Sequence, residues 1–304
     1  MSARLRDLAR QTERIVTAGR YEAPDGREVP LGPAIDAAQA GTRVYGPEPV
    51  PVPTAHDGAD GYGLHPDPVQ IALPRGGTWI EVTGESSLEA ARRLAAGSAG
   101  PPAVLNFASA RNPGGGYLNG AQAQEEALCR ASALYTCLLR APAFYEHHRT
   151  HRDPFYTDRV IHSPGVPVFR DDRDRLLAEP FTAGFLTSPA PNAGVIRRTA
   201  PERASDLPRA LAVRAERVLE TAAAHGYRAL VLGAWGCGVF RNDPAQVAAA
   251  FRALLEPGGR FAGTFAHVVF GVLDRTRDQA VRTAFDRAFA DLAAPGDAAP
   301  QLQP

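Results

Sequence analysis

Short apolar runs alternate with amphipathic stretches along most of the chain. The apolar runs predict buried strands at 78–82, 103–107, 160–163, 184–188, 229–234 and 267–272. The amphipathic stretches predict helices at 2–18, 85–96, about 121–140, about 204–225, 244–255 and 276–292. Because strands and helices alternate, the pattern predicts an α/β fold in which helices cover both faces of one sheet.

The two ends of the chain differ from this alternating part. The stretch at 2–18 predicts an amphipathic helix whose apolar face holds Leu5, Leu8, Ile15 and Val16. Residues 41–76 are rich in Pro and Gly, which predicts irregular chain or an extended arm and no separate core. The tail at 293–304 is predicted to be disordered. We therefore expect one domain over 1–292, with the helix and arm of 1–76 packed on it.

The composition is that of a soluble globular protein without a broad nucleic-acid surface. The sequence has 304 residues, of which 44% are hydrophobic and 22% are charged, and its formal net charge is zero. Direct nucleic-acid binding through many phosphate contacts needs a basic excess, so the charge balance argues against it. All 33 basic residues are Arg. This bias extends over the whole chain and marks no site, but it leaves room for a local Arg-lined pocket.

The cysteines and the start of the chain indicate a reducing compartment. Cys129, Cys137 and Cys237 show no metal-binding spacing, and the first two lie in an apolar helical pattern, as buried free thiols do. The first residues lack an apolar core of signal-peptide length, and no stretch approaches the about 18 to 20 apolar residues of a membrane span. We expect a cytoplasmic protein with no metal, no cofactor and no membrane contact.

The segment after the strand at 103–107 is where we expect the chemistry. It passes through Asn112 into Gly114-Gly115-Gly116 and then into a helix that begins near Gln124. Open α/β sheets bind ligands at the carboxyl ends of their strands, and glycines let bare N–H groups approach a diphosphate or a ribose. The helix N-terminus adds further N–H donors. The run matches neither the dinucleotide nor the P-loop motif, and on its own it fits a connector loop with helix-capping glutamates as well.

The order of the motif residues carries a family resemblance. Gly114-Gly115-Gly116, then seven residues, then Gln124-Glu125-Glu126 resembles the signature of poly(ADP-ribose) glycohydrolases, and the chain is most similar to their compact bacterial branch. The likeness extends to QTERIVTAGRY at 11–21, NFASARNPGGG at 106–116, HSPGVPVFRDD at 162–172, TSPAPN at 187–192 and GAWGCGVFRNDP at 233–244. The resemblance implies a three-layer α/β/α macrodomain with a central mixed β-sheet and an N-terminal helical extension.

The resemblance also implies a reaction and a role for each glutamate. The reaction is hydrolysis of the ribose–ribose O-glycosidic bond of ADP-ribose polymers, mainly from chain ends, through an oxocarbenium-like transition state. By resemblance, Glu126 protonates the leaving oxygen and later activates water, which a substrate phosphate helps to position, while Glu125 orients the bound ribose. Neighbouring helical side chains point about 100° apart, which supports such a division of labour. The helix N-terminus favours the ionised carboxylate, so burial must supply the upward pKa shift that an acid needs.

A second glycine loop follows the strand at 229–234. Here the family resemblance places the diphosphate, and it makes Phe240 the aromatic that packs against the adenine and the proximal ribose. The expected contacts are Gly236, Cys237, Gly238, Val239 and Phe240. A turn with a core Phe is the alternative interpretation of this loop. Cys237 also suggests a nucleophile, but no partnering His is identifiable, and we do not favour that role.

Several polar positions have two interpretations at this stage. Asn112 and Gln124 are expected to contact substrate, with Asn112 at the distal ribose. Asn106 is either a ribose ligand or a structural residue at a strand end. The TSPAPN segment either shapes the adenine side of the cleft or is a Pro-stiffened loop. The histidines of EHHRTH at 146–151 suggest a metal, but no Asp or Cys pattern completes a site, so a solvated polar segment is the favoured interpretation.

The expected partners are poly(ADP-ribose) on modified proteins as substrate and ADP-ribose as product. Two other functions share the fold: a non-catalytic ADP-ribose-binding macrodomain, and a hydrolase that removes single ADP-ribose units from proteins. Glu125-Glu126 argues against the first and favours polymer cleavage over the second. An interaction scaffold without a nucleotide site is a third possibility, which ADP-ribose binding would exclude.

Overall fold

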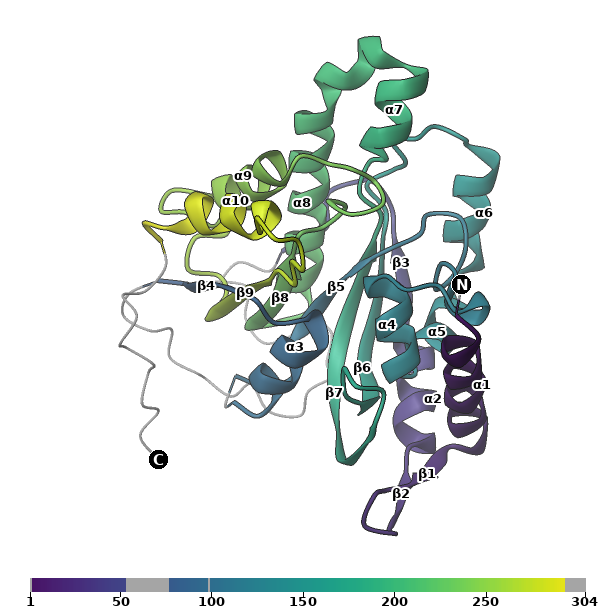
Figure 1. Ribbon diagram of the computed structural model, residues 1–304. Helices are drawn as coiled ribbons and strands as arrows, with labels where there is room; N and C mark the ends of the chain where they lie inside the picture. The colour runs from purple at the N-terminus through teal and green to yellow at the C-terminus, as the bar shows by residue number, and fades with distance from the viewer. Residues whose placement is uncertain (1, 53–76, 98, 293–304) are drawn as a thin grey trace.

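A seven-stranded mixed sheet is the centre of the computed structural model, which describes residues 2–52, 77–97 and 99–292 (Figure 1). Its strands are β3 (Arg43–Tyr45), β4 (Trp79–Thr83), β5 (Ala103–Phe107), β6 (Val160–Arg170), β7 (Leu176–Ser188), β8 (Ala229–Gly233) and β9 (His267–Gly271). The order across the sheet is β3-β6-β7-β5-β8-β9-β4. A separate hairpin is formed by β1 (Arg20–Glu22) and β2 (Glu28–Pro30).

Five neighbouring strands of the sheet run in the same direction. β7, β5, β8, β9 and β4 pair in parallel, whereas β6 and β3 join the β7 edge in antiparallel fashion. The register places Phe107 opposite Ser188 and Gly233 opposite Gly271. The carboxyl ends of these strands therefore lie along one edge of the sheet, and the loops that follow them meet there.

Helices cover both faces of the sheet. One face carries α1 (Ala3–Ala18), α2 (Gly32–Gly41), α3 (Ser87–Ala95), α4 (Gln124–Ala131), α5 (Leu134–Leu138) and α6 (Pro142–Thr150). The other face carries α8 (Leu207–Ala224), α9 (Pro244–Leu255) and α10 (Ala280–Phe289). Two short elements, α7 (Ala193–Thr199) and the 3-10 helix η2 (Pro201–Asp206), lie between β7 and α8. The three-layer α/β/α arrangement is thus confirmed.

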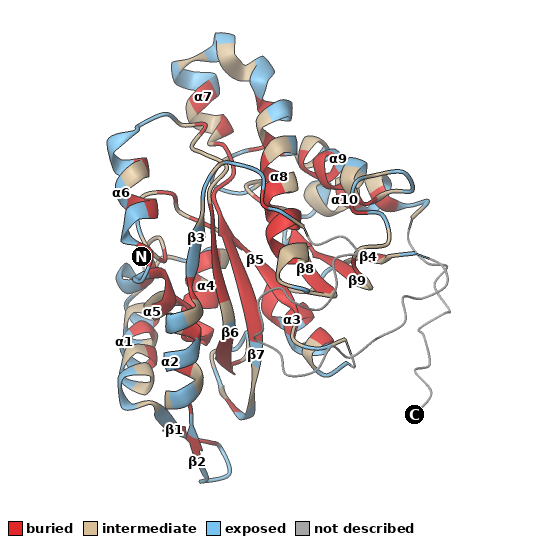
Figure 2. Cartoon of the chain, turned by 180° about the vertical axis from the view of Figure 1, so that it is seen from behind, coloured by how far each residue is buried: buried red, intermediate tan, exposed pale blue. Residues whose placement is uncertain are grey.

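Alternation along each central strand explains why both faces are covered. Val104 packs into the core under α1 to α6, while its neighbour Leu105 packs into the core under α8 to α10. Val231 and Leu232 divide in the same way along β8. Figure 2 shows β5 and β8 in the red of buried residues over nearly their whole length. Successive side chains of a strand point to opposite faces, so a strand that is apolar throughout needs a helical layer on each side.

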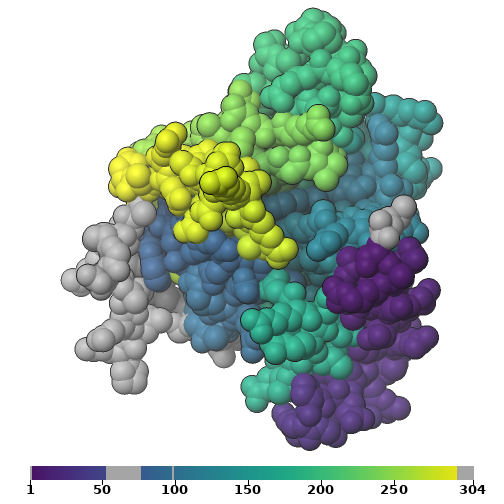
Figure 3. All heavy atoms as spheres, viewed as in Figure 1, coloured from purple at the N-terminus to yellow at the C-terminus, as the bar shows by residue number. Residues whose placement is uncertain are grey.

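The first helix supports the loop expected to hold the chemistry. α1 starts at the N-cap Ser2 and ends at Gly19, whose φ of +66° is the left-handed C-cap conformation. The hydroxyl of Tyr117, within the 3-10 turn η1 (Tyr117–Asn119), donates to the main-chain O of Ala9 at 3.2 Å. Figure 3 shows the purple N-terminal residues packed against teal ones. The predicted N-terminal helix is confirmed, and it braces the glycine loop.

The single helix predicted at about 121–140 is wrong, because the chain breaks it at Ser132. The backbone of Ser132 is extended (φ −145°, ψ 176°) and forms an isolated bridge to Val168 of β6. Its hydroxyl donates to the main-chain O of Leu128 at 2.7 Å and accepts from the N–H of Leu134 at 3.2 Å. A serine that satisfies main-chain groups in this way competes with the helix, so α4 ends and α5 begins there.

Two predicted strands were too short, and several elements were not predicted. β6 and β7 extend far beyond 160–163 and 184–188, because Pro164-Gly165 in β6 and Glu179-Pro180 in β7 interrupt the apolar pattern without ending the strand. Short elements without strong periodicity, such as α2, α6, α7 and β3, were not anticipated. β3 gives the start of the predicted arm a place at the sheet edge. The rest of that arm, 53–76, and the tail at 293–304 lie outside the described residues. None of the described helices is long and apolar enough to span a bilayer.

Candidate active site

The loops after β5 and β8 form the candidate site, since these strands are neighbours in the sheet. In the first loop, Gly114 and Gly115 have φ values of +65° and +59°. A Cβ on Gly115 would lie 2.5 Å from Oε1 of Glu126 and 3.1 Å from Oε2 of Glu125. Glycine is thus required at this position both for the backbone conformation and for the room that the two carboxyl groups occupy.

Glu125 is a buried carboxyl with protein donors on both oxygens. Its side chain belongs to a residue only 3% exposed. Oε2 accepts the main-chain N–H of Ser109 at 2.7 Å, and Oε1 accepts Nδ2 of Asn106 at 3.3 Å. Burial raises the pKa of Glu125 to about 8, and the hydrogen bonds from Ser109 and Asn106 offset only part of that rise. The group is therefore held in place and is largely protonated near neutral pH.

Glu126 differs from its neighbour because one of its oxygens is uncommitted. Oε1 accepts the main-chain N–H of Gly116 at 2.8 Å. Oε2 is buried and has no hydrogen-bond partner within the described part of the chain. A buried polar oxygen without a partner is costly in a folded protein, and at a ligand site it indicates a group that substrate would satisfy.

Gln124 and Asn106 tie the start of α4 to the strands beneath it. The Oε1 of Gln124 accepts the N–H of Phe107 at 2.9 Å, and its Nε2 donates to the O of Leu105 at 2.8 Å. Asn106 is buried in the sheet, and its Nδ2 also donates to the hydroxyl of Thr187 at 3.1 Å. Both amides are thus bonded to protein groups that fix α4 on β5. Asn112, in contrast, is exposed at the mouth of the glycine loop.

The second loop, 234–243, is anchored beneath and open at its tip. The indole of buried Trp235 donates to the O of Ser188 at 2.9 Å, and Gly236 has a φ of +72°. Nδ2 of Asn242 donates to the O of Gly236 at 3.0 Å. The tip residues Gly238 and Val239 are exposed, with Val239 81% accessible. The loop therefore presents main-chain groups and one apolar side chain above a rigid base.

The comparisons with known proteins agree with this geometry. The sequence model of the family described as microbial-type PARG, catalytic domain, matches residues 9–171. The chain belongs to the microbial-type poly(ADP-ribose) glycohydrolase family. A crystal structure of poly(ADP-ribose) glycohydrolase from Thermomonospora curvata is 48% identical, with a TM-score of 0.84 over 95% of this chain and 100% of that one.

Two further solved glycohydrolases carry bound molecules. The Thermomonospora curvata enzyme bound to the inhibitor ADP-HPD is 49% identical, with a TM-score of 0.81 over 95% of this chain and 100% of that one. The Deinococcus radiodurans enzyme in complex with ADP-ribose is 42% identical, with a TM-score of 0.73 over 86% of this chain and 99% of that one. A comparison with curated proteins gave no match. The macrodomain-like fold expected from the resemblance is thereby confirmed.

Within this glycohydrolase, one aromatic beside Phe240 was missed by the sequence analysis. The ring of Tyr156 lies 5.8 Å from that of Phe240, centroid to centroid. Its φ of +58° is in the left-handed region, which non-glycine residues rarely adopt. Tyr156 belongs to the loop between α6 and β6, and the only signal in the sequence is the irregular stretch after EHHRTH. The loop is tied to the TSPAPN segment, since Asn192 N–H donates to the O of Pro154 at 2.8 Å.

The cysteine and histidines of the glycohydrolase have environments unlike those of a nucleophile or a metal site. Burial raises the pKa of Cys237 to about 12, so little thiolate forms at neutral pH. His148 is buried and bonded to protein groups on both ring nitrogens, and His147 stacks on His151 at 4.1 Å. Across the described residues, no group of three or more His, Cys, Asp or Glu side chains could hold a metal ion.

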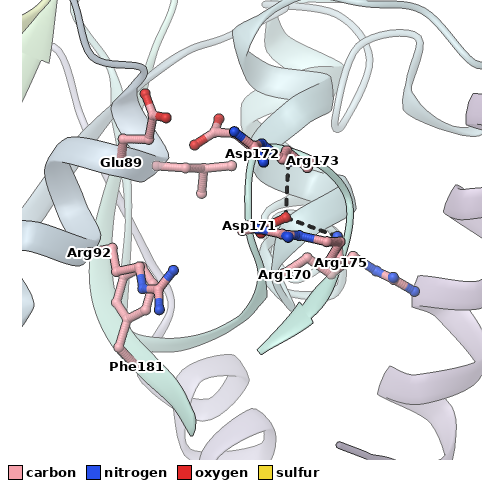
Figure 4. A pocket seen from close by; sticks show the side chains of 9 residues that line it. Glu89, Arg92, Arg170, Asp171, Asp172, Arg173, Arg175 and Phe181 are labelled. Atoms are coloured by element: carbon pink, nitrogen blue, oxygen red, sulfur yellow. Dashed lines mark hydrogen bonds and ion pairs between the residues drawn. The ribbon is translucent and has the colours of Figure 1, made fainter. Parts of the chain in front are cut away.

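Two surface pockets lie apart from the glutamates. One of about 250 Å³ lies between α3 and the β6–β7 hairpin (Figure 4). Within the hairpin, Asp171 forms an ion pair with Arg175, and its Oδ1 accepts the main-chain N–H groups of Arg173 and Arg175 at 2.9 Å each. The other, of about 420 Å³, is lined by Asp36, Gln39, Ala40 and Arg140. The first includes Arg170, Asp171 and Asp172 from the 162–172 segment, but neither pocket is lined by a residue that the sequence analysis proposed for catalysis or substrate binding.

Proposed function

We propose that this chain hydrolyses the ribose–ribose O-glycosidic bonds of poly(ADP-ribose) on modified proteins and releases ADP-ribose, mainly from chain ends. The observation that carries the proposal is the pair of carboxyl groups behind the glycine loop, of which Glu126 keeps one buried oxygen that has no partner among the described residues. Family membership and the similarity to solved poly(ADP-ribose) glycohydrolases support the same reaction.

Glu126 is the proposed general acid. The N–H of Gly116 holds its Oε1, which leaves Oε2 directed at a partner outside the protein. Protonating the leaving oxygen at that position accounts for bond cleavage, and the resulting carboxylate then activates a water molecule. The two carboxyl groups are neighbours in the first turn of α4, whereas ordinary glycosidases place theirs on opposite sides of the bond. A substrate phosphate is therefore the proposed aid in positioning that water.

Glu125 is the proposed positioning residue for the distal ribose. Burial raises its pKa to about 8, so near neutral pH it retains a proton that it can donate to a ribose hydroxyl. Asn112 and the glycine run are the proposed contacts to the same ribose, with Gln124 holding the helix in register. The exposed tip of the second loop is the proposed diphosphate site, and the ring of Phe240 is proposed to pack against the adenine and the proximal ribose.

The proposal is tested with matched Glu→Gln variants. Release of ADP-ribose from purified polymer is measured for wild type, E126Q, E125Q and the exposed control E202Q, alongside ADP-ribose binding by calorimetry. We expect E126Q to lose about 10²–10⁴-fold in kcat while still binding ADP-ribose, and E125Q to lose activity together with ribose affinity. E202Q should match wild type.

The alternatives predict different outcomes of the same measurements. A wild-type protein that binds ADP-ribose but releases none from polymer is a binding macrodomain, and the enzyme proposal is then wrong. Faster release of single protein-linked units than of polymer units would make the chain a mono-ADP-ribosyl hydrolase. Comparing free ADP-ribose with longer oligomers among early products tests the preference for chain ends.

A further inference from the structure

Hydrogen bonds link the loop that carries Asn112 to two neighbouring arginines of the chain, Arg149 and Arg152, through Arg111. On α6, Arg149 donates from Nη1 to the main-chain O of Arg111 at 3.0 Å. Arg111 in turn donates from Nη2 to the main-chain O of Arg152 at 3.4 Å. These bonds join α6 and its following loop to the loop after β5, and Figure 1 shows α6 beside that loop. We refer to Arg111, Arg149 and Arg152 as the leaving-side arginines.

The charges of the leaving-side arginines are not neutralised. The guanidinium groups of Arg149 and Arg111 donate to main-chain carbonyls, and within 2–52, 77–97 and 99–292 none of the three arginines forms an ion pair with a carboxylate. The adjacent Asp153 is engaged elsewhere, with Arg203 at 2.9 Å. Arg149 and Arg152 are exposed, while Nε of Arg111 is buried without a hydrogen-bond partner. A chain with zero net charge thus has three arginines without an ion pair, among the described residues, in and next to the loop that carries Asn112.

The chemistry of the polymer indicates which group the leaving-side arginines can bind. The scissile bond joins the distal ribose of one unit to the adenosine of the next, so the chain continues from the ribose end of the site. Each further unit carries a diphosphate. Asn112 and the glycine loop are the proposed contacts to the distal ribose, and Arg111 directly precedes Asn112 in the sequence. Arginine binds phosphate oxygens through its planar set of N–H donors, so arginines next to Asn112 are suited to bind the diphosphate of the following unit.

We propose that the leaving-side arginines bind the diphosphate of the polymer unit beyond the scissile bond. The proposal rests on the proposed function, because that function sets which way the polymer enters. It predicts that the protein holds polymer more tightly than free ADP-ribose. It also predicts that this added affinity weakens with salt, because each phosphate contact releases a counterion.

The test compares R149A/R152A with the control R14A/R209A. Residues Arg14 and Arg209 are also exposed, and neither forms an ion pair within the described residues. Two substrates are used: polymer, and a minimal substrate in which a single ADP-ribose is linked to adenosine without a further diphosphate. We expect R149A/R152A to lower kcat/KM on polymer about tenfold, through KM, and to leave the minimal substrate unaffected. The salt slope of log kcat/KM on polymer should fall by about 0.7 per lost phosphate contact. The control should change neither.

Binding measurements keep the two proposals separable. Polymer affinity is measured in the E126Q background, with and without R149A/R152A, and single-stranded RNA is added as a competitor at equal phosphate concentration. If wild type releases no ADP-ribose but its affinity for polymer still depends on the arginines, the proposed function is wrong and the subsite stands. Equal loss on both substrates, no loss on polymer, or equally effective competition by RNA would overturn the subsite.

Discussion

Replacing Gly115 by Ala perturbs the site at a single point. The added Cβ would lie 2.5 Å from Oε1 of Glu126, whereas ordinary contacts begin at 3.4 Å, so the carboxyl and the loop must separate by about 0.9 Å. That shift breaks the 2.8 Å bond from Gly116 N–H. A displacement of about 1 Å at reacting groups costs about 10²-fold in rate, and we expect this loss in kcat.

Gly115→Ala also strains the backbone, and this contribution can be measured separately. A left-handed φ costs a residue with a Cβ about 1–2 kcal/mol. Gly165 is the matched control, since its φ of +56° is close to the +59° of Gly115 and an added Cβ there meets no atom within 4 Å. The backbone strain should lower the free energy of unfolding by similar amounts in both variants, which corresponds to about 2–4 °C in Tm per kcal/mol, and the lost Gly116–Glu126 hydrogen bond adds to the loss in Gly115→Ala.

The assay is ADP-ribose release from polymer, run beside thermal unfolding on both variants. We expect Gly115→Ala to lose about 10²-fold in kcat, and Gly165→Ala to retain wild-type kcat although its backbone is strained in the same way. If Gly115→Ala stays within about threefold of Gly165→Ala, the carboxyl geometry does not limit the reaction, and our account of the loop is wrong.

Three further predictions concern groups around the same loop. Burial raises the pKa of Glu125 to about 8, so the stability that its protonated form contributes is complete below about pH 4.5 and is lost as the pH rises through 8. The Tm of wild type should therefore fall relative to that of E125Q when both are measured from pH 5 to 9. Gln124→Ala removes three hydrogen bonds to protein groups, and chemical unfolding should show a loss of about 2–3 kcal/mol at about 1 kcal/mol each; an unchanged midpoint would refute its structural role. Cys237→Ala should keep kcat within severalfold of wild type, because burial raises the pKa of the thiol to about 12; loss of all activity with ADP-ribose binding intact would restore the nucleophile hypothesis.

The sequence determined the layered fold and the position of the chemistry. Consecutive apolar residues in the central strands, such as Val104-Leu105 in β5 and Val231-Leu232 in β8, predict burial on both faces of the sheet. The glycine run and the two glutamates fall between a strand and a helix, where local spacing is sufficient to place them at a strand's carboxyl end. These features depend on residues close together in the chain, which is why periodicity and motif order could identify them.

Tertiary structure decided how the carboxyl groups differ. Local pattern gives Glu125 and Glu126 the same helix turn, yet Glu125 is held by Ser109 and by Asn106, which also bonds Thr187 from another strand. The end of α4 at Ser132 likewise depends on a bridge to a strand that comes later in the chain. Contacts between distant segments form only when the sheet assembles, so the local sequence pattern around each residue does not predict them. Burial and partner choice, and hence the chemistry of each glutamate, follow from that assembly.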